Sequence, residues 1–259
     1  CARLAVAGVR QIDYQSGVST SLEAAIRRNM MGGLGLMVEQ ISQKNHDDLG
    51  ADGWEISAHA ASAPDHEPIQ GRQYPDAEYQ RLNGSLRRRI GTLNCGHNAF
   101  PILLGVNAPQ HTAQELEKFR RDNEKGVDYE GRHFATVYEA TQAQRGIERA
   151  IRAQKRRLLV DEEAGDAERR TQDQIRLRRL NAEYRRFSKA AGLRTEEERL
   201  MVSGFGNKQA RAAEAAQKGF ADFSASLAGV RSSTGVVVGE VSPHAYAQAN
   251  IRGVDKPSV

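Results

Sequence analysis

One stretch of the sequence, residues 138–192, constrains the fold more than any other, because it is polar and rich in helix-favouring residues. A turn at 163–166 divides it into two helices. In the second helix, apolar side chains recur at alternating steps of three and four residues, the spacing of a narrow helix–helix seam: Leu177, Leu180, Tyr184, Phe187 and Ala191. The sequence therefore predicts a long antiparallel helical hairpin with a thin apolar contact.

The overall composition favours the same kind of fold. Of the 259 residues, 39% are hydrophobic and 27% are charged, which suits an elongated helical protein better than a compact enzyme. No apolar run approaches the roughly 20 residues that a membrane-spanning helix needs, so we expect no membrane span. The chain starts at Cys1 and ends abruptly, and we expect it to be an internal piece of a longer polypeptide.

A further helix is predicted within an N-terminal segment, residues 1–48. Six apolar side chains follow one another at steps of three and four residues and form one stripe on a helix of about 22 residues: Leu22, Ile26, Met30, Leu34, Met37 and Ile41. Gly32, Gly33 and Gly35 interrupt this pattern. Because each glycine costs a helix roughly 1 kcal/mol, we expect a kink or a close helix contact there.

Residues 49–137 are expected to form a small mixed core with short strands. Trp54–His59 alternates between apolar and polar residues as a strand does. Residues 100–106 are a second apolar run, and Pro101 places it at a sheet edge or a strand start. A short helix follows from Thr112, and then a short hairpin or extended strap over 129–137.

The expected fold class is therefore α+β and predominantly helical, with the small core followed by the helical hairpin arm, residues 138–203. Residues 204–259 are rich in alanine, glycine and serine. They are predicted to be a linker and the start of an incomplete C-terminal module.

Residues with metal-binding chemistry gather between positions 54 and 101, which hold three of the chain's seven histidines. Imidazole and thiolate suit Zn²⁺, so one interpretation is a tetrahedral zinc site. It would be built from four residues: His59, His66, Cys95 and His97. Their spacing matches no recognised zinc finger. In the alternative interpretation, the histidines hydrogen-bond backbone groups and fix the proline-containing loops without a metal.

A third interpretation makes Cys95 a nucleophile with a histidine as its base. Such a site also needs a group that orients the base, for which Asp65 is the candidate, and a pocket for an oxyanion. The corresponding hypothesis is a metal- or cysteine-dependent hydrolase. The sequence gives no indication of a substrate, and no residue is assigned a catalytic role.

Other residues of the central stretch are assigned structural roles: Trp54, Pro64, Asp65, Gln70, Gly71, Arg72, Asn94 and Pro101. Gly71 permits a turn or a close backbone approach. Arg72 is a candidate ion-pair partner of Asp65 or Glu67.

The first helix of the hairpin carries a group of basic residues that are candidates for phosphate contacts: Arg149, Arg152, Lys155, Arg156 and Arg157. Residues 145–189 hold 14 Lys/Arg against 8 Asp/Glu, whereas the whole chain has a net charge of only +4. In the alternative interpretation these residues form a solvated helix face without a ligand, which the interleaved acidic residues favour. No aromatic residues alternate with the basic ones in a way that indicates base stacking.

Taken together, these motifs resemble the phage minor capsid protein 2 family, which is related to the Mu F-type minor head proteins of tailed phages. The resemblance runs over about residues 14–205 and rests on blocks found in the same order: Ile56-Ser-Ala-His59, Pro64-Asp-His66, Gln70-Gly-Arg72, Asn94-Cys-Gly-His97, Phe100-Pro101, Tyr138–Arg145 and Arg185-Arg-Phe-Ser188. The chain departs from the family pattern at Ile69, where a tryptophan is expected. It also departs at Thr92 and Leu93, where the family often has a second cysteine.

The resemblance implies a virion structural protein that lies near the portal and the inner head surface, with a role in head assembly or DNA delivery. The implied partners are portal and capsid proteins, with packaged DNA as a secondary ligand and homo-oligomerisation as a further option. The protein would be found in the virion, and in the bacterial cytoplasm during assembly. The alternatives are the hydrolase and a non-specific DNA-binding head protein, whose affinity would fall steeply with salt.

Overall fold

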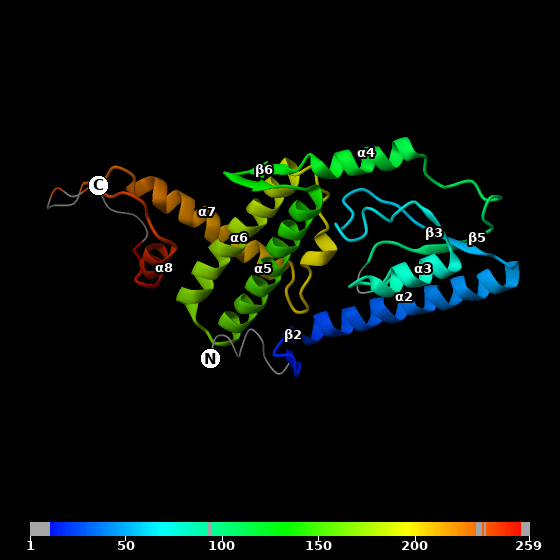
Figure 1. The fold of residues 1–259 in the computed structure, drawn as a ribbon. Coiled ribbons are helices and arrows are strands. Elements are labelled where there is room, and N and C mark those ends of the chain that lie inside the picture. The colour runs from blue at the N-terminus through cyan, green and yellow to red at the C-terminus, as the bar shows by residue number, and fades with distance from the viewer. Residues whose placement is uncertain (1–10, 93–94, 232–234, 236, 255–259) are drawn as a thin grey trace. The chain divides into compact units, whose positions relative to one another are not determined.

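A computed structural model describes residues 11–92, 95–231, 235 and 237–254, and the chain divides after Thr141 into two compact units. Long helices and a few short strands make the protein a predominantly helical α+β fold, as the sequence predicts (Figure 1). Among the described residues, no helix is long and apolar enough to cross a membrane. The four segments expected from the sequence stay a prediction about domain organisation.

Among the residues that the structure describes, the first unit holds all the named strands, three whole helices and the start of a fourth. In chain order its elements are β1 Gln11–Asp13, β2 Ser19–Ser21, α2 Leu22–Leu49, β3 Gly53–Ile56, β4 Gln73–Pro75, α3 Asp76–Ser85, β5 Ala99–Ile102, α4 Ala113–Glu124, β6 Val127–Tyr129 and β7 Arg132–Phe134, followed by the start of α5 Val137–Glu163.

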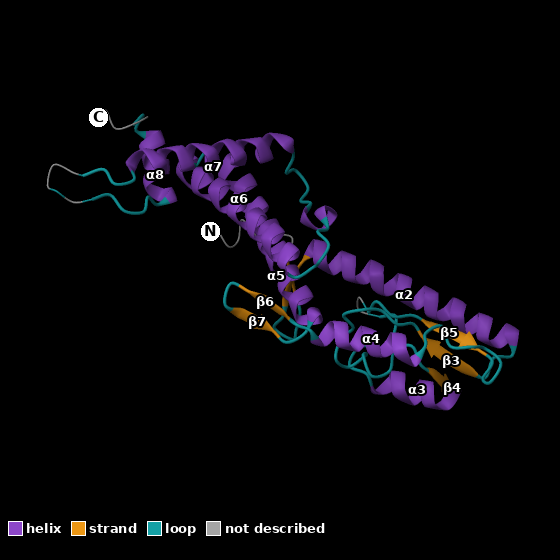
Figure 2. Ribbon diagram, turned by 90° about the horizontal axis from the view of Figure 1, so that it is seen from above, coloured by secondary structure: helices purple, strands orange, loops and turns teal. Residues whose placement is uncertain are grey.

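The centre of this unit is a three-stranded antiparallel sheet in the order β4-β3-β5 (Figure 2). Trp54 in the central strand pairs with Tyr74 on one side and Pro101 on the other. Its side chain is buried and stacks between His46 of α2 and Tyr79 of α3, at 4.9 and 5.2 Å between ring centroids. Trp54 therefore ties both helices to the sheet.

Both predicted strands exist but are shorter than the sequence indicates. The first ends at Ile56 instead of 59, and the second spans Ala99–Ile102 instead of 100–106. The short helix after Thr112 is confirmed, because the Thr112 hydroxyl accepts from the N–H of Glu115 and the Glu115 carboxylate accepts in return. The hairpin is confirmed as β6–β7, which turns at Glu130 and Gly131.

Helix α2 is longer than expected, because it continues to Leu49. Of the kink or close contact predicted at its glycines, a close contact is found at Gly35, where an added Cβ would lie 2.0 Å from the backbone oxygen of Gly91. Gly32 and Gly33 have nothing within 4 Å of such a Cβ among the described residues. At the other end, Nε2 of His46 lies 2.8 Å from a carboxylate oxygen of Asp76.

The predicted apolar stripe of α2 faces solvent. We call it the apolar row; its members and their exposed fractions are Leu22 38%, Ile26 49%, Met30 65%, Leu34 53%, Met37 56% and Ile41 55%. Ala25, beside the row, is buried. The helix is thus anchored by a few residues, while its most regular apolar side is uncovered in this chain.

The second unit contains the predicted helical hairpin, formed by α5 and α6 Ala167–Ala190. Hydrogen bonds from Gln144 to Ser188 and from Gln154 to the backbone oxygen of Asp173 show that the two helices run antiparallel. The predicted seam is confirmed. Its buried members pack with residues of neighbouring elements in one core: Ile151, Leu158, Leu177, Tyr184, Leu200 and Ala213.

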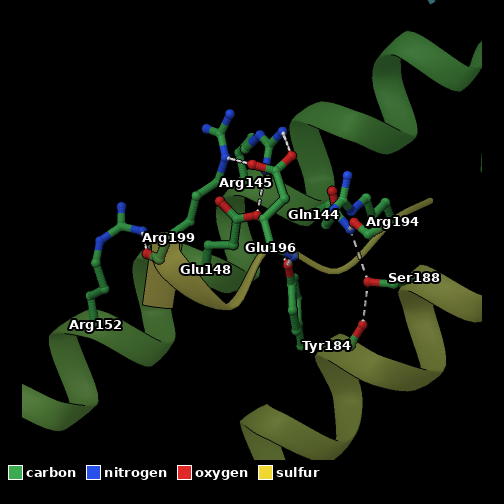
Figure 3. Close-up of polar contacts among 9 residues, drawn as sticks. All are labelled: Gln144, Arg145, Glu148, Arg152, Tyr184, Ser188, Arg194, Glu196 and Arg199. Carbon is green, nitrogen blue, oxygen red and sulfur yellow. Dashed lines mark hydrogen bonds and ion pairs between the residues drawn. The ribbon is translucent and has the colours of Figure 1, made fainter. Parts of the chain in front are cut away.

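A polar network joins α5, α6 and the segment that follows them (Figure 3). The Tyr184 hydroxyl lies 3.3 Å from Oε1 of Glu148 and accepts from the backbone N–H of Glu196 at 2.9 Å. Arg145 bridges the two carboxylates, at 2.5 Å to Glu148 and 3.1 Å to Glu196. The network encloses a buried glutamate with a guanidinium and a phenol, so its charge is compensated.

Helices occupy much of the segment after residue 204, which the sequence predicts to be a linker and the start of a further module. The short η2 Glu197–Leu200 precedes this segment. The segment itself contains α7 Asn207–Leu227 and α8 Pro243–Ile251. Figure 1 shows α7 crossing α6. Alanine is the best helix former, and Phe220 of α7 packs with Ile175 of α6 and Tyr246 of α8. A composition that looks like a linker is therefore a packed helix.

Candidate metal centre

Three of the four residues expected to bind a metal lie together. The ligand atoms of His66, Cys95 and His97 are within 4.8 Å of one another. Sγ of Cys95 is 3.3 Å from Nδ1 of His66 and 3.4 Å from Nδ1 of His97. Both histidines are buried, whereas Cys95 is partly exposed. The fold thus assembles one sulfur and two imidazole nitrogens from two loops that are distant in the sequence.

Local backbone bonds position the cysteine loop. Cys95 and His97 precede β5, and Asn98 holds this loop to the end of β3. The N–H of Ser57 donates to the backbone oxygen of Asn98 at 2.8 Å, and the N–H of Asn98 donates to the Ser57 hydroxyl at 2.9 Å. The N–H of His97 also donates to Cys95 Sγ at 3.4 Å. The sulfur is therefore held by its own loop as well as by the histidines.

Hydrogen bonds on the far side of each imidazole fix which nitrogen carries the proton. Nε2 of His66 lies 2.8 Å from the backbone oxygen of Arg88, which can only accept. Nε2 of His97 lies 2.9 Å from Oε1 of Gln70, an oxygen that also accepts from the backbone N–H of His59 at 3.0 Å. Both Nε2 atoms are therefore donors. Both Nδ1 atoms present a bare lone pair to the sulfur.

His59, the fourth expected residue, lies beside the cluster but outside it. Its ring stacks on His97 at 4.2 Å between centroids. Its Nδ1 lies 2.8 Å from the backbone oxygen of Ala60, so that nitrogen carries the proton. Its Nε2 is buried and has no hydrogen-bond partner among the described residues. A Cβ at Gly96 would lie 3.0 Å from this nitrogen, so the glycine leaves it room.

The buried surroundings keep His97 uncharged. Burial, together with the neighbouring His59 and His66, lowers the pKa of His97 from 6.5 to about 3. The ring is therefore neutral at physiological pH. The neutral imidazole is the form that can bind a metal.

Asp65 does not take the orienting role considered for it in the hydrolase hypothesis. One of its carboxylate oxygens is 3.8 Å from Nε2 of His66, which faces the closer backbone oxygen of Arg88. Asp65 pairs with the guanidinium of Arg88 at 3.5 Å, rather than with Arg72, and Glu67 accepts from Asn123 at 3.2 Å. A backbone carbonyl, which leaves no signal in the sequence, orients the histidine.

The remaining motif residues support the loops around the cluster. Gly71 has a φ of +65°, and an added Cβ would lie 2.3 Å from the Leu116 side chain, so the position requires glycine twice over. Pro64 and Arg72 are exposed at the surface of the unit. Asn94 lies outside the described residues. Ser62 was not singled out from the sequence, yet its hydroxyl is buried 3.3 Å from Nε2 of His97.

Three of the five basic residues considered for DNA contacts are used within the helical unit. Arg152 donates to the backbone oxygen of Arg199 at 2.5 Å, and Lys155 donates to that of Leu200 at 2.7 Å. Arg157 lies 3.7 Å from the carboxylate of Asp173. Arg156 is half-buried, and Arg149 is exposed. DNA binding by this group stays a prediction.

The comparisons with known proteins place the chain in a family. No curated protein and no solved structure matches it. The family described as phage minor capsid protein 2 matches residues 1–189, a range that contains the sheet, the His/Cys cluster and almost all of the helical hairpin. The chain therefore belongs to the phage minor capsid protein 2 family and is a structural protein of a phage capsid.

Proposed function

We propose that the protein is built into the phage head through the apolar row of α2, which contacts portal or capsid proteins on the inner side of the head. The observation that carries this proposal is the exposure of all six members of the row, each 38% or more. Exposed apolar patches that extend beyond scattered single residues mark interaction sites. Within this helix of 28 residues the row runs from Leu22 to Ile41, over roughly 30 Å, which fits a helix-in-groove contact.

Packaged DNA is a secondary ligand in this proposal. The excess of basic residues over 145–189 supports it, and so does the exposed Arg149. Arg152, Lys155 and Arg157 already make contacts within the protein. Protein contacts through α2 therefore rank first.

The test is co-expression with the portal protein of the same phage, followed by size-exclusion chromatography. We expect co-elution of the two proteins. The double variant Met30→Asp/Met37→Asp places two carboxylates in the row and should abolish co-elution while the circular dichroism spectrum stays unchanged.

The matched control is Arg28→Asp. Arg28 is exposed and lies two residues from Met30, on the opposite side of the helix. This variant should co-elute like the unmodified chain. Co-elution that survives the Met30/Met37 substitutions would show that another surface binds the portal. A failure of the unmodified chain to co-elute with portal or capsid protein would refute the proposal as a whole.

A further inference from the structure

We propose that His66, Cys95 and His97 bind one Zn²⁺ ion, with His59 as the fourth ligand, and that this ion fastens the loop after β3 to the loop before β5. The inference is independent of what α2 binds. The distances between the sulfur and nitrogen atoms fit such a site. With Zn–S of about 2.3 Å and Zn–N of about 2.0 Å, a tetrahedral site separates sulfur from nitrogen by about 3.5 Å. The observed Sγ–Nδ1 distances are 3.3 and 3.4 Å.

The lone pairs of the two histidines also point in the right direction for a metal. The oxygen of Arg88 and the side-chain oxygen of Gln70 occupy the N–H groups of His66 and His97. Metal-binding histidines are typically held in this way, with the nitrogen away from the metal donating to an oxygen. In both rings, the free nitrogen is the one that faces Cys95.

The cluster has too few hydrogens to satisfy both Nδ1 atoms. A thiol has one hydrogen and can donate to one of the two Nδ1 atoms only. Without a cation, the other lone pair faces the lone pairs of sulfur inside the protein, where an unsatisfied acceptor is unfavourable. A divalent cation satisfies all three atoms at once. Cys95 loses its proton to solvent on binding and becomes a thiolate ligand.

His59 supplies the fourth position. Its Nδ1–H is used by Ala60, so its bare lone pair is on Nε2, the buried atom without a hydrogen-bond partner among the described residues. The ring stacks directly on His97, one of the three clustered residues. Three imidazoles and one thiolate form a nitrogen-rich ligand set that suits Zn²⁺.

The first test is elemental analysis of the purified full chain after dialysis against metal-free buffer. We expect about one zinc per chain, and less than a tenth of that in Cys95→Ala. The matched control is His133→Gln, because His133 is exposed in the β6–β7 hairpin and far outside the cluster's contacts. It should retain the zinc of the unmodified chain. A fully folded chain that binds no zinc when Zn²⁺ is supplied would overturn the proposal.

The second test needs no change to the cluster, so it does not depend on whether Cys95→Ala folds. In a Cys1→Ser background, Cys95 is the remaining cysteine of the chain. Replacing Zn²⁺ by Co²⁺ should produce a sulfur-to-cobalt charge-transfer band and the intense visible absorption of a four-coordinate ion. Bound Zn²⁺ should also slow the reaction of Cys95 with a thiol reagent at least tenfold. Equal reaction rates with and without Zn²⁺ would contradict a thiolate ligand.

The assignment of His59 is tested separately with His59→Gln. Zinc affinity, measured by competition with a chromophoric chelator, should fall at least tenfold relative to the unmodified chain. An unchanged affinity would overturn His59 as the fourth ligand.

Discussion

The side-chain oxygen of Gln70 accepts two hydrogen bonds, from the backbone N–H of His59 and from Nε2 of His97. The glutamine is buried, so neither donor has water as a substitute. One amide thereby holds the backbone at His59, three residues beyond the end of β3, and orients an imidazole 27 positions further along the chain.

Gln70→Leu is expected to destabilise the protein by about 2 kcal/mol or more, because it leaves two donors without an acceptor at about 1–3 kcal/mol for a buried group. Urea unfolding followed by circular dichroism, at a fixed Zn²⁺ concentration, measures the change. Gln80→Leu, at an exposed position on α3, should stay within about 0.5 kcal/mol. Equal stability of the two variants would contradict the role given to Gln70.

Two neighbouring glycines of α2 should respond oppositely to alanine. At Gly33 the added methyl group meets nothing within 4 Å among the described residues, so Gly33→Ala should stabilise the helix by up to about 1 kcal/mol. At Gly35 it would lie 2.0 Å from the backbone oxygen of Gly91, so Gly35→Ala should destabilise by about 1–3 kcal/mol. Thermal unfolding of the two variants distinguishes them. If both were stabilising, the contact between α2 and the loop at Gly91 would be refuted.

Tyr184→Phe removes a hydroxyl that serves both Glu148 and the N–H of Glu196. The ring stays packed in the helical core, so the loss is confined to hydrogen bonding. We expect about 1–2 kcal/mol less stability in urea unfolding. Tyr14→Phe, in an exposed turn, is the control and should have no measurable effect. An unchanged free energy of unfolding in Tyr184→Phe would mean that water replaces the hydroxyl.

The helical unit should be less stable at neutral than at mildly acidic pH because of Asp161. Burial, and then the neighbouring Asp173 carboxyl, raises the pKa of Asp161 from 3.8 to about 6. A folded-state pKa above the unfolded value means that the folded protein binds the proton more tightly. The contribution to stability is therefore present below about pH 4 and lost as the pH rises through 6.

Asp161→Asn should remove this dependence. At pH 7 it is expected to be more stable than the unmodified chain by about 1 kcal/mol, and the difference should vanish near pH 4. Urea unfolding of both proteins between pH 4 and 8 provides the measurement. A constant difference across that range would show that Asp161 is charged in both states and that its pKa is ordinary.

The hairpin seam and the Thr112 cap could be predicted because their signals are local. Steps of three and four residues, and a hydroxyl three residues before a glutamate, are read within one or two turns of chain. Strand β4 gave no such signal, because three residues, Gln73–Pro75, become a strand only by pairing with β3. Helix α7 was missed because its alanines could equally belong to a linker until Phe220 is seen packed on α6.

The site was predicted as a set of four residues, and the structure brings three of them together. What the sequence could not provide is the outer layer of contacts. The acceptor for His66 is a backbone oxygen. Every residue carries such an oxygen, so the sequence does not indicate which one the histidine meets. The periodicity of α2 likewise defined a stripe but not its surroundings, since a stripe covered by the same chain and one left for a partner have the same spacing.

Three of the chain's four methionines lie in α2, at Met30, Met31 and Met37, and all three are exposed. An unbranched thioether side chain has three rotatable bonds and adjusts its shape to the surface that covers it. Met30 and Met37 belong to the apolar row and give it this adaptability. Under the contact proposed for this row, one sequence can fit non-identical partner surfaces in a particle, where a row of isoleucine and valine would fit only one.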